Sequence, residues 1–214
     1  MTGGESVVTR EPVSHRRRQS ESLVFVGNWG DHLHAAWFDP TSGTLSASEP
    51  VAAIGRSNWS VQHPTEPLLY VTDGATGELV ALAVDRVSGT VSEADRVGAG
   101  GGLAHLHLDP RSQTIIGADY QGGGTVAFPL DGDGTFSDIT ESAFGDQVNT
   151  RSAAAVACAD VNLDGHLDIF VGNLMARDFR DFASGNHPGH YDALYLNNGD
   201  LTFNEIAEEA GVRG

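Results

Sequence analysis

The chain has 214 residues and a net charge of −17, from 29 acidic residues against 12 basic ones, all of which are arginine. This charge would repel nucleic acid and anionic membranes, so neither is an expected partner. One cysteine, Cys158, excludes an internal disulfide, and its apolar surroundings favour a buried side chain over a nucleophile. Abundant glycine and short apolar runs favour an all-β fold.

The N-terminal residues 1–21 are polar, with an arginine run at 16–18, and are predicted to be a disordered tail. The apolar run after them, which begins at Leu23, is too short for a membrane span or for the hydrophobic region of a signal peptide. A twin-arginine export signal is the alternative interpretation of the arginine run. The compartment therefore stays open.

A repeat of about 45 residues organises the middle of the chain. Apolar runs begin at Leu23, Leu68 and Thr114, and turn glycines recur at the same spacing. Such a period, with four short apolar runs per unit, predicts β-propeller blades of four antiparallel strands. The first blade is predicted at Leu23–Gly27, His34–Phe38 and Thr44–Ala47; the second at Asn58–Gln62, Leu68–Thr72, Glu78–Asp85 and Thr90–Val97.

The third blade is predicted at Leu103–Leu108, Thr114–Asp119, Thr125–Leu130 and Thr135–Thr140; the fourth at Ala153–Ala159, Leu167–Gly172, Ala193–Leu196 and Thr202–Ile206. The first blade thus lacks its innermost strand, and the expected fold is an incomplete or open propeller of about four blades. Unpaired blade edges recruit partners, so self-association through them is expected.

Residues 22–134 resemble the lactonase family of seven-bladed propellers, which includes 6-phosphogluconolactonase. The resemblance rests on GRSNWSVQHP at 55–64, LLYVTDG at 68–74, GGLAHLHLDP at 101–110 and GADYQGGGTVAFPLDGDG at 117–134. It implies that His105 and Tyr120 reach the central cavity, as cavity or substrate-binding residues. The histidine, arginine and glutamate that the family uses for chemistry have no counterpart in the later part of this chain.

A calcium site is predicted at residues 160–168, where oxygen side chains occupy positions 1, 3, 5 and 9 of a loop and Gly165 occupies position 6. The predicted ligands are Asp160, Asn162, Asp164, the backbone carbonyl of His166, and Asp168. Ca²⁺ is the expected cofactor because it prefers several oxygen ligands. A plain turn rich in Asp, Asn and Gly is the alternative.

Residues 135–214 resemble the FG-GAP/VCBS repeat, a calcium-binding propeller blade. The resemblance rests on DVNLDGHLDIFVGN at 160–173 and LYLNNGDLTFNEIAEEAGV at 194–212, with Leu201 where that family usually has glycine. It implies a boundary near residue 134 between a lactonase-like part and an FG-GAP-like blade. The first part would suit the cytoplasm, and the second an extracellular place.

Three other features admit a functional interpretation. His105 and His107 alternate on one strand and could form a metal or proton-transfer pair, although ordinary strand positions near the channel explain them as well. The glycine runs at 98–102 and 122–124 precede no helix and are expected to be turns. The insertion 174–190 is expected to be a solvated recognition loop, and a metal site at its histidines His187 and His190 is the alternative.

Two functions follow from these features. The first is a calcium-binding propeller segment that acts as a non-catalytic binding module for a protein or carbohydrate ligand. The second is a sugar-lactone hydrolase of the 6-phosphogluconolactonase type, completed by oligomerisation.

Overall fold

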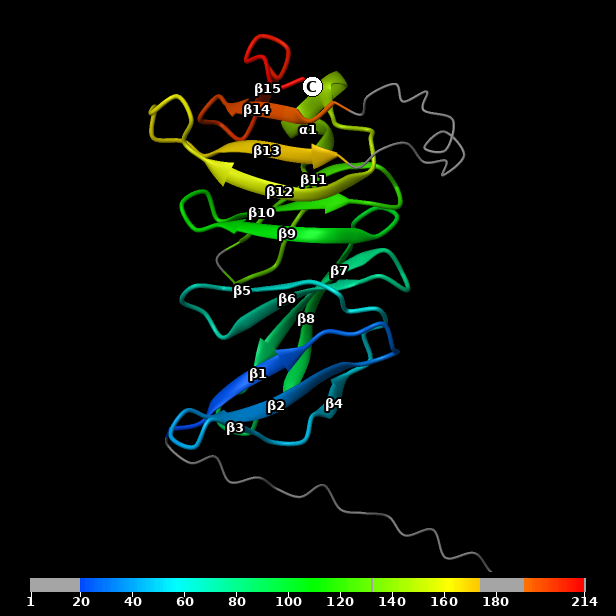
Figure 1. Cartoon of the computed structure of the whole chain (residues 1–214), viewed down its shortest axis with the longest axis vertical. Helices are drawn as coiled ribbons and strands as arrows, with labels where there is room; N and C mark the ends of the chain where they lie inside the picture. Colours follow the sequence, from blue (N-terminus) through cyan, green and yellow to red (C-terminus); the bar gives the residue numbers. More distant parts are fainter. Residues whose placement is uncertain (1–19, 132, 174–190, 214) are drawn as a thin grey trace, which may run out of the picture.

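A computed structural model describes residues 20–131, 133–173 and 191–213. The chain forms antiparallel sheets that follow one another along its long axis in sequence order (Figure 1). The first and last sheets lie at opposite ends of this stack, so the arc does not close. The predicted all-β fold of about four blades in an open propeller is confirmed.

The second blade has the predicted order of four neighbouring strands, β5-β6-β7-β8. All six residues of the second strand are buried, because the blade is covered on both faces. The carboxylate of Asp73 accepts the N–H groups of Ala75 and Thr76 and so closes the next turn. The strands are β5 Ser60–Gln62, β6 Leu68–Asp73, β7 Glu78–Val84 and β8 Val91–Gly98.

The third blade keeps only three of its predicted strands, namely β9 Leu103–Asp109, β10 Thr114–Asp119 and β11 Gly124–Pro129. The strand predicted at Thr135–Thr140 is wrong. A single bridge pairs Leu130 with Phe136, and a short helix, α1 Thr140–Phe144, begins where the strand would end. The helix forms because it places Ala143 and Phe144 in the core shared with the fourth blade.

The fourth blade contains β12 Ala153–Ala159, β13 Asp168–Asn173, β14 Ala193–Asn197 and β15 Phe203–Glu205, in that order. Its predicted strands are confirmed. A short 3₁₀ turn, η1 Gly145–Gln147, precedes it. The predicted calcium loop connects β12 to β13 and projects at the same side of the molecule as the turn between β9 and β10 (Figure 1).

The first blade contains β1 Ser22–Val26 and β2 Leu33–Asp39, which pair antiparallel. Its third strand is broken in two, β3 Thr44–Leu45 and β4 Glu49–Ala52, and both pieces pair with the same edge of β2. The sequence predicted only the first piece. Among the described residues β1 has no strand on its other edge, as expected for a blade that lacks its inner strand.

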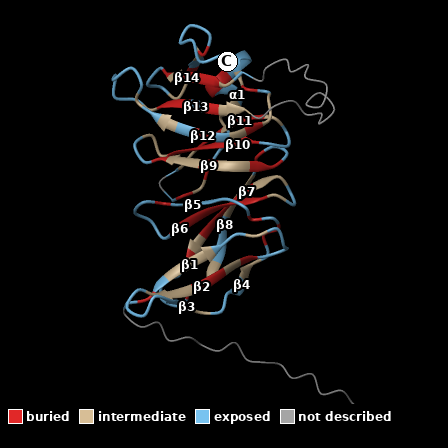
Figure 2. Cartoon of the chain, in the orientation of Figure 1, coloured by how far each residue is buried: buried red, intermediate tan, exposed pale blue. Residues whose placement is uncertain are grey.

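Three apolar clusters hold the stack together, one between each pair of successive blades (Figure 2). Leu33 and Ile54 pack on Val71 and Val80 between the first two blades. The other two clusters are built in the same way, around Tyr70 and Phe128 and around Val171 and Tyr195 respectively. Each inner blade is therefore stabilised by both of its neighbours.

Some predictions concern parts of the chain beyond this description. Residues 1–19 of the expected tail at 1–21, and the insertion at 174–190 with its two histidines, lie outside the described residues. Within the described part, no helix has the length and apolar character needed to cross a membrane.

Candidate functional site

The inner strands of the second, third and fourth blades are β5, β9 and β12, and each pairs with only one strand of its own sheet. Their other edges carry main-chain N–H and C=O groups that need partners from elsewhere. Two aromatic side chains meet part of this need. These side chains belong to Trp59 and His105, and we call them the inner-edge group.

Trp59 lies directly before β5 and is fixed there by its main chain, whose carbonyl accepts the N–H of Thr72 at 3.0 Å. Its indole Nε1 donates to the carbonyl of Leu106 in the next blade at 3.2 Å. The residue is 38% exposed, so part of its surface stays accessible to solvent. Trp59 therefore satisfies an edge carbonyl of β9 and offers an apolar surface beside it.

His105 makes an equivalent contact one blade further along the chain. Its Nδ1 accepts the main-chain N–H of Val156, on β12, at 2.9 Å. Its ring also meets the ring of Trp59 edge to face, with centroids 4.3 Å apart and planes at 85°. The three blades are thus connected at their inner edges by two aromatic side chains in contact with each other.

The protonation state of His105 follows from this geometry. A ring nitrogen that accepts an N–H carries no proton, so the neutral ring holds its proton on Nε2. Burial lowers the pKa of His105, and the neighbouring His107 lowers it further. The ring is therefore neutral near pH 7, and its remaining polar atom is a hydrogen-bond donor.

The predicted cavity residue Tyr120 and the histidine His107 lie on the same blade as His105. His107 is two positions along β9 from His105 and faces the same side of the strand. Tyr120 follows β10 and lies two residues beyond Ala118, the register partner of His105. Tyr120 is 47% exposed. The assignment of His105 and Tyr120 to a substrate cavity stays a prediction.

The glycine-rich segments are turns in close contact, not phosphate loops. The carboxylate of Asp119 accepts N–H groups of Gly101, Gln121 and Gly122 at 2.8, 3.1 and 2.8 Å. A Cβ on Gly122 would lie 2.0 Å from Asp119 Oδ2, so a larger residue does not fit there. Asp119, which is only 4% exposed, thus joins two connections next to Tyr120.

In the loop at residues 160–168, which we call the aspartate loop, carboxylate side chains accept hydrogen bonds from main-chain N–H groups of the same loop. Asp160 accepts the N–H groups of Asp164 and Gly165, at 3.0 and 2.9 Å, and Asp164 accepts that of His166 at 2.9 Å. Asp168 is 1% exposed, and its two oxygens accept the N–H groups of Val161 and Asn197. The His166 ring lies against Gly199 in the turn between β14 and β15.

The chemistry of this loop suits calcium, because Asp160, Asn162 and Asp164 all present oxygen. The oxygens of Asp160 and Asn162 both lie within 3.1 Å of the nitrogen of Asp164, so they are close together. However, no three His, Cys, Asp or Glu side chains of the described residues are gathered as metal ligands. Calcium binding therefore stays a prediction.

Cys158 lies on β12 and packs against the core between the third and fourth blades. Burial, with smaller contributions from Asp109 and Asp168, raises the pKa of its thiol to about 12. A thiolate does not form near neutral pH, so Cys158 acts as a partly buried apolar residue and not as a nucleophile.

These features define a class of protein: a partial β-propeller whose inner strands are bridged by aromatic side chains. A family model described as "Lactonase, 7-bladed beta-propeller" matches residues 24–164, which is more than half of the chain. The chain belongs to the lactonase seven-bladed β-propeller family. The resemblance of residues 135–214 to FG-GAP/VCBS repeats gains no support, because the lactonase match continues through β12 into the aspartate loop.

Solved structures show the same fold. A Bacteroides uniformis protein provisionally assigned as a 6-phosphogluconolactonase is 18% identical, with a TM-score of 0.61 over 87% of this chain and 53% of its own. The periplasmic gluconolactonase PpgL of Pseudomonas aeruginosa is 13% identical, with a TM-score of 0.58 over 86% of this chain and 66% of its own.

A Lactobacillus plantarum protein is 16% identical, with a TM-score of 0.59 over 86% of this chain and 52% of its own. The chain therefore spans between about half and two thirds of the length of these proteins. A search of curated proteins found no match.

The sequence indicated His105 but gave no reason to select Trp59. The two positions are 46 residues apart, which is the repeat spacing, so they are equivalent in successive blades. That equivalence, combined with the aromatic character of both side chains, is the signal from which Trp59 could have been found.

Proposed function

We propose that the chain forms part of the cavity of a sugar-lactone hydrolase. The observation that carries this proposal is the lactonase family match over residues 24–164, together with the inner-edge group of Trp59 and His105. The names of two similar structures, a 6-phosphogluconolactonase and a gluconolactonase, favour an aldonic acid lactone as the substrate class.

The described residues suit the recognition of such a ring. Trp59, which is 38% exposed, can offer the apolar surface of its indole to the C–H face of a sugar. His105, with its proton on Nε2, is a donor that can hydrogen-bond the lactone carbonyl oxygen and polarise it toward attack by water. Because Nδ1 accepts the N–H of Val156, the ring acts as a donor and not as a general base.

A test is the hydrolysis of δ-gluconolactone by the purified full chain, followed by acid release and corrected for spontaneous hydrolysis. We expect turnover above the spontaneous rate, and a decrease of about tenfold or more in His105→Phe. His32→Phe, an exposed histidine in the connection between β1 and β2, is the matched control. No hydrolysis above the spontaneous rate, even at high protein concentration, would exclude a hydrolase made by this chain alone or with copies of itself.

A second candidate is a calcium-dependent binding module without catalysis. The proximity of the Asp160 and Asn162 oxygens in the loop between β12 and β13 favours it. Calorimetric titration with CaCl₂ tests it: Asp160→Ala and Asp164→Ala should weaken binding strongly, whereas His166→Ala should not, since only its carbonyl would bind. Absence of any calcium heat, or equal losses in all three variants, would reject the ligand assignment.

A further inference from the structure

In the second, third and fourth blades, the strand equivalent to β1 pairs with an inner strand. The second strands of the next two blades, β6 and β10, are buried at all six residues, because β5 and β9 pair with their inner edges. In β1, by contrast, Ser22 and Val26 are exposed, and the residues between them are only partly buried. An inner strand is missing at this one place among the described blades.

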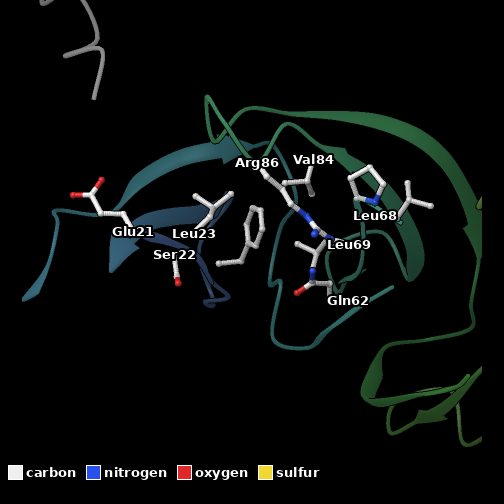
Figure 3. Close-up of a pocket in the computed structure, with 10 residues that line it drawn as sticks. Glu21, Ser22, Leu23, Gln62, Leu68, Leu69, Val84 and Arg86 are labelled. Atoms are coloured by element: carbon white, nitrogen blue, oxygen red, sulfur yellow. The ribbon is translucent and has the colours of Figure 1, made fainter. Parts of the chain in front are cut away.

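A cavity of about 260 Å³ lies beside the open edge of β1 (Figure 3). Its walls come from the first two blades and combine apolar side chains with polar and charged ones, Glu21, Gln62 and Arg86. The residues that form the apolar part are Leu23, Phe25, Leu68, Leu69 and Val84.

The next blade shows what fills the equivalent space. Leu23 and Phe25 precede Leu68 and Tyr70 by 45 residues, one repeat. In the second blade, Val61 of β5 pairs with Tyr70 and packs into the core, and the ring of His63 lies 6.5 Å from that of Tyr70. The side chains of an inner strand therefore occupy the place where the first blade has a cavity.

We propose that the edge of β1 and the adjacent cavity form an acceptor site for an extended peptide strand from another polypeptide. The peptide would run antiparallel to β1, as β5 runs to β6, and place an apolar side chain over Phe25. Main-chain hydrogen bonds to the edge supply part of the affinity, and the cavity selects an apolar residue at one position. Because the chain carries a net charge of −17, a neutral or basic peptide is favoured over an acidic one.

The probe is a synthetic fluorescent peptide with the sequence of residues 57–64, SNWSVQHP, which contains strand β5 of this chain. We expect it to bind the full chain and to slow hydrogen exchange in β1. The same peptide with Asp in place of its valine should bind at least about tenfold more weakly, since a carboxylate would lie over the apolar side chains of Leu23 and Phe25. Absence of binding up to about 1 mM would overturn the proposal.

Two N-methylated peptides test main-chain pairing on the unaltered protein. In one, the methyl groups block the amides that would face β1; in the other, they block the alternate amides, which face away. Only the first set should abolish binding, because successive amides of a strand point to opposite sides. Equal behaviour of the two sets would show that no strand is added.

Protein variants locate the site. Phe25→Ala should weaken peptide binding about tenfold or more, whereas Phe38→Ala, on the opposite face of the same sheet, should not. Tighter peptide binding after deletion of residues 1–19 would assign the edge to the chain's own N-terminal segment and overturn an external partner. A concentration-dependent mass with a protected β1 and no peptide binding would assign it instead to a second copy.

Discussion

Replacement of Asp119 by alanine should destabilise the contact between two connections next to the inner-edge group. The carboxylate is 4% exposed and accepts three main-chain N–H groups, from Gly101, Gln121 and Gly122. A hydrogen bond to a charged group contributes about 1.5–3 kcal/mol, and a buried donor left without a partner costs a similar amount. Since losses within one network are not additive, we expect Asp119→Ala to lower the free energy of unfolding by about 3–5 kcal/mol.

Chemical denaturation measures the total effect, and hydrogen exchange locates it. The amides of Gly101 and Gly122 should lose protection in Asp119→Ala while those of β13 keep it. Asp85→Ala is the control, because Asp85 closes an equivalent turn through Val87 and Ser88 but is exposed to solvent, and it should lose much less stability. An Asp119→Ala protein within about 1 kcal/mol of the wild type, with unchanged protection of Gly101 and Gly122, would refute this reasoning.

Three further outcomes are expected. Hydrogen bonds from hydroxyl or main-chain N–H groups of their own turns lower the pKa values of five aspartates below 3.8, namely Asp39, Asp85, Asp133, Asp164 and Asp200. Their stabilising effect is therefore present above pH 3.8 and is lost as the pH falls through the lowered pKa values. Acid denaturation measures this loss. His105 has a pKa below 6.5 because of its burial and the nearby His107, so its contribution is complete above pH 6.5 and declines as the pH falls toward the folded-state pKa. NMR titration should show this low value, and an ordinary one would contradict the burial of the ring. Leu163 is 87% exposed at φ +62, so Leu163→Gly should gain up to about 1 kcal/mol in thermal unfolding, whereas the neighbouring Val161→Gly should lose stability.

The sequence predicted the blades because their signal is local and repeated. Apolar runs, turn glycines and capping aspartates recur every 45 or 46 residues, and the structure places a strand or a turn at nearly every one of them. The prediction of a strand at Thr135–Thr140 failed for a physical reason. Its choice of a helix depends on Phe144 packing against Tyr195 and Phe203, which lie more than 50 residues further along the chain.

The inner-edge group was only half predictable for a similar reason. His105 stands out as one of two alternating histidines, but its partner Val156 has no polar side chain and donates through its main chain. The tautomer of His105, and the role of Trp59 beside it, follow from how three blades meet. No spacing within one blade specifies that geometry.

The two hydrogen bonds at the inner edges both run from a side chain of an earlier blade to the main chain of the next blade. Trp59 reaches forward to Leu106, and His105 reaches forward to Val156, so in both cases the side chain precedes the strand it contacts by about 50 residues. On the ribosome, each of these side chains is therefore synthesised before the strand that it will hold. A newly made blade meets a finished docking point on the one before it, which suits a protein that folds from its N-terminus as it emerges.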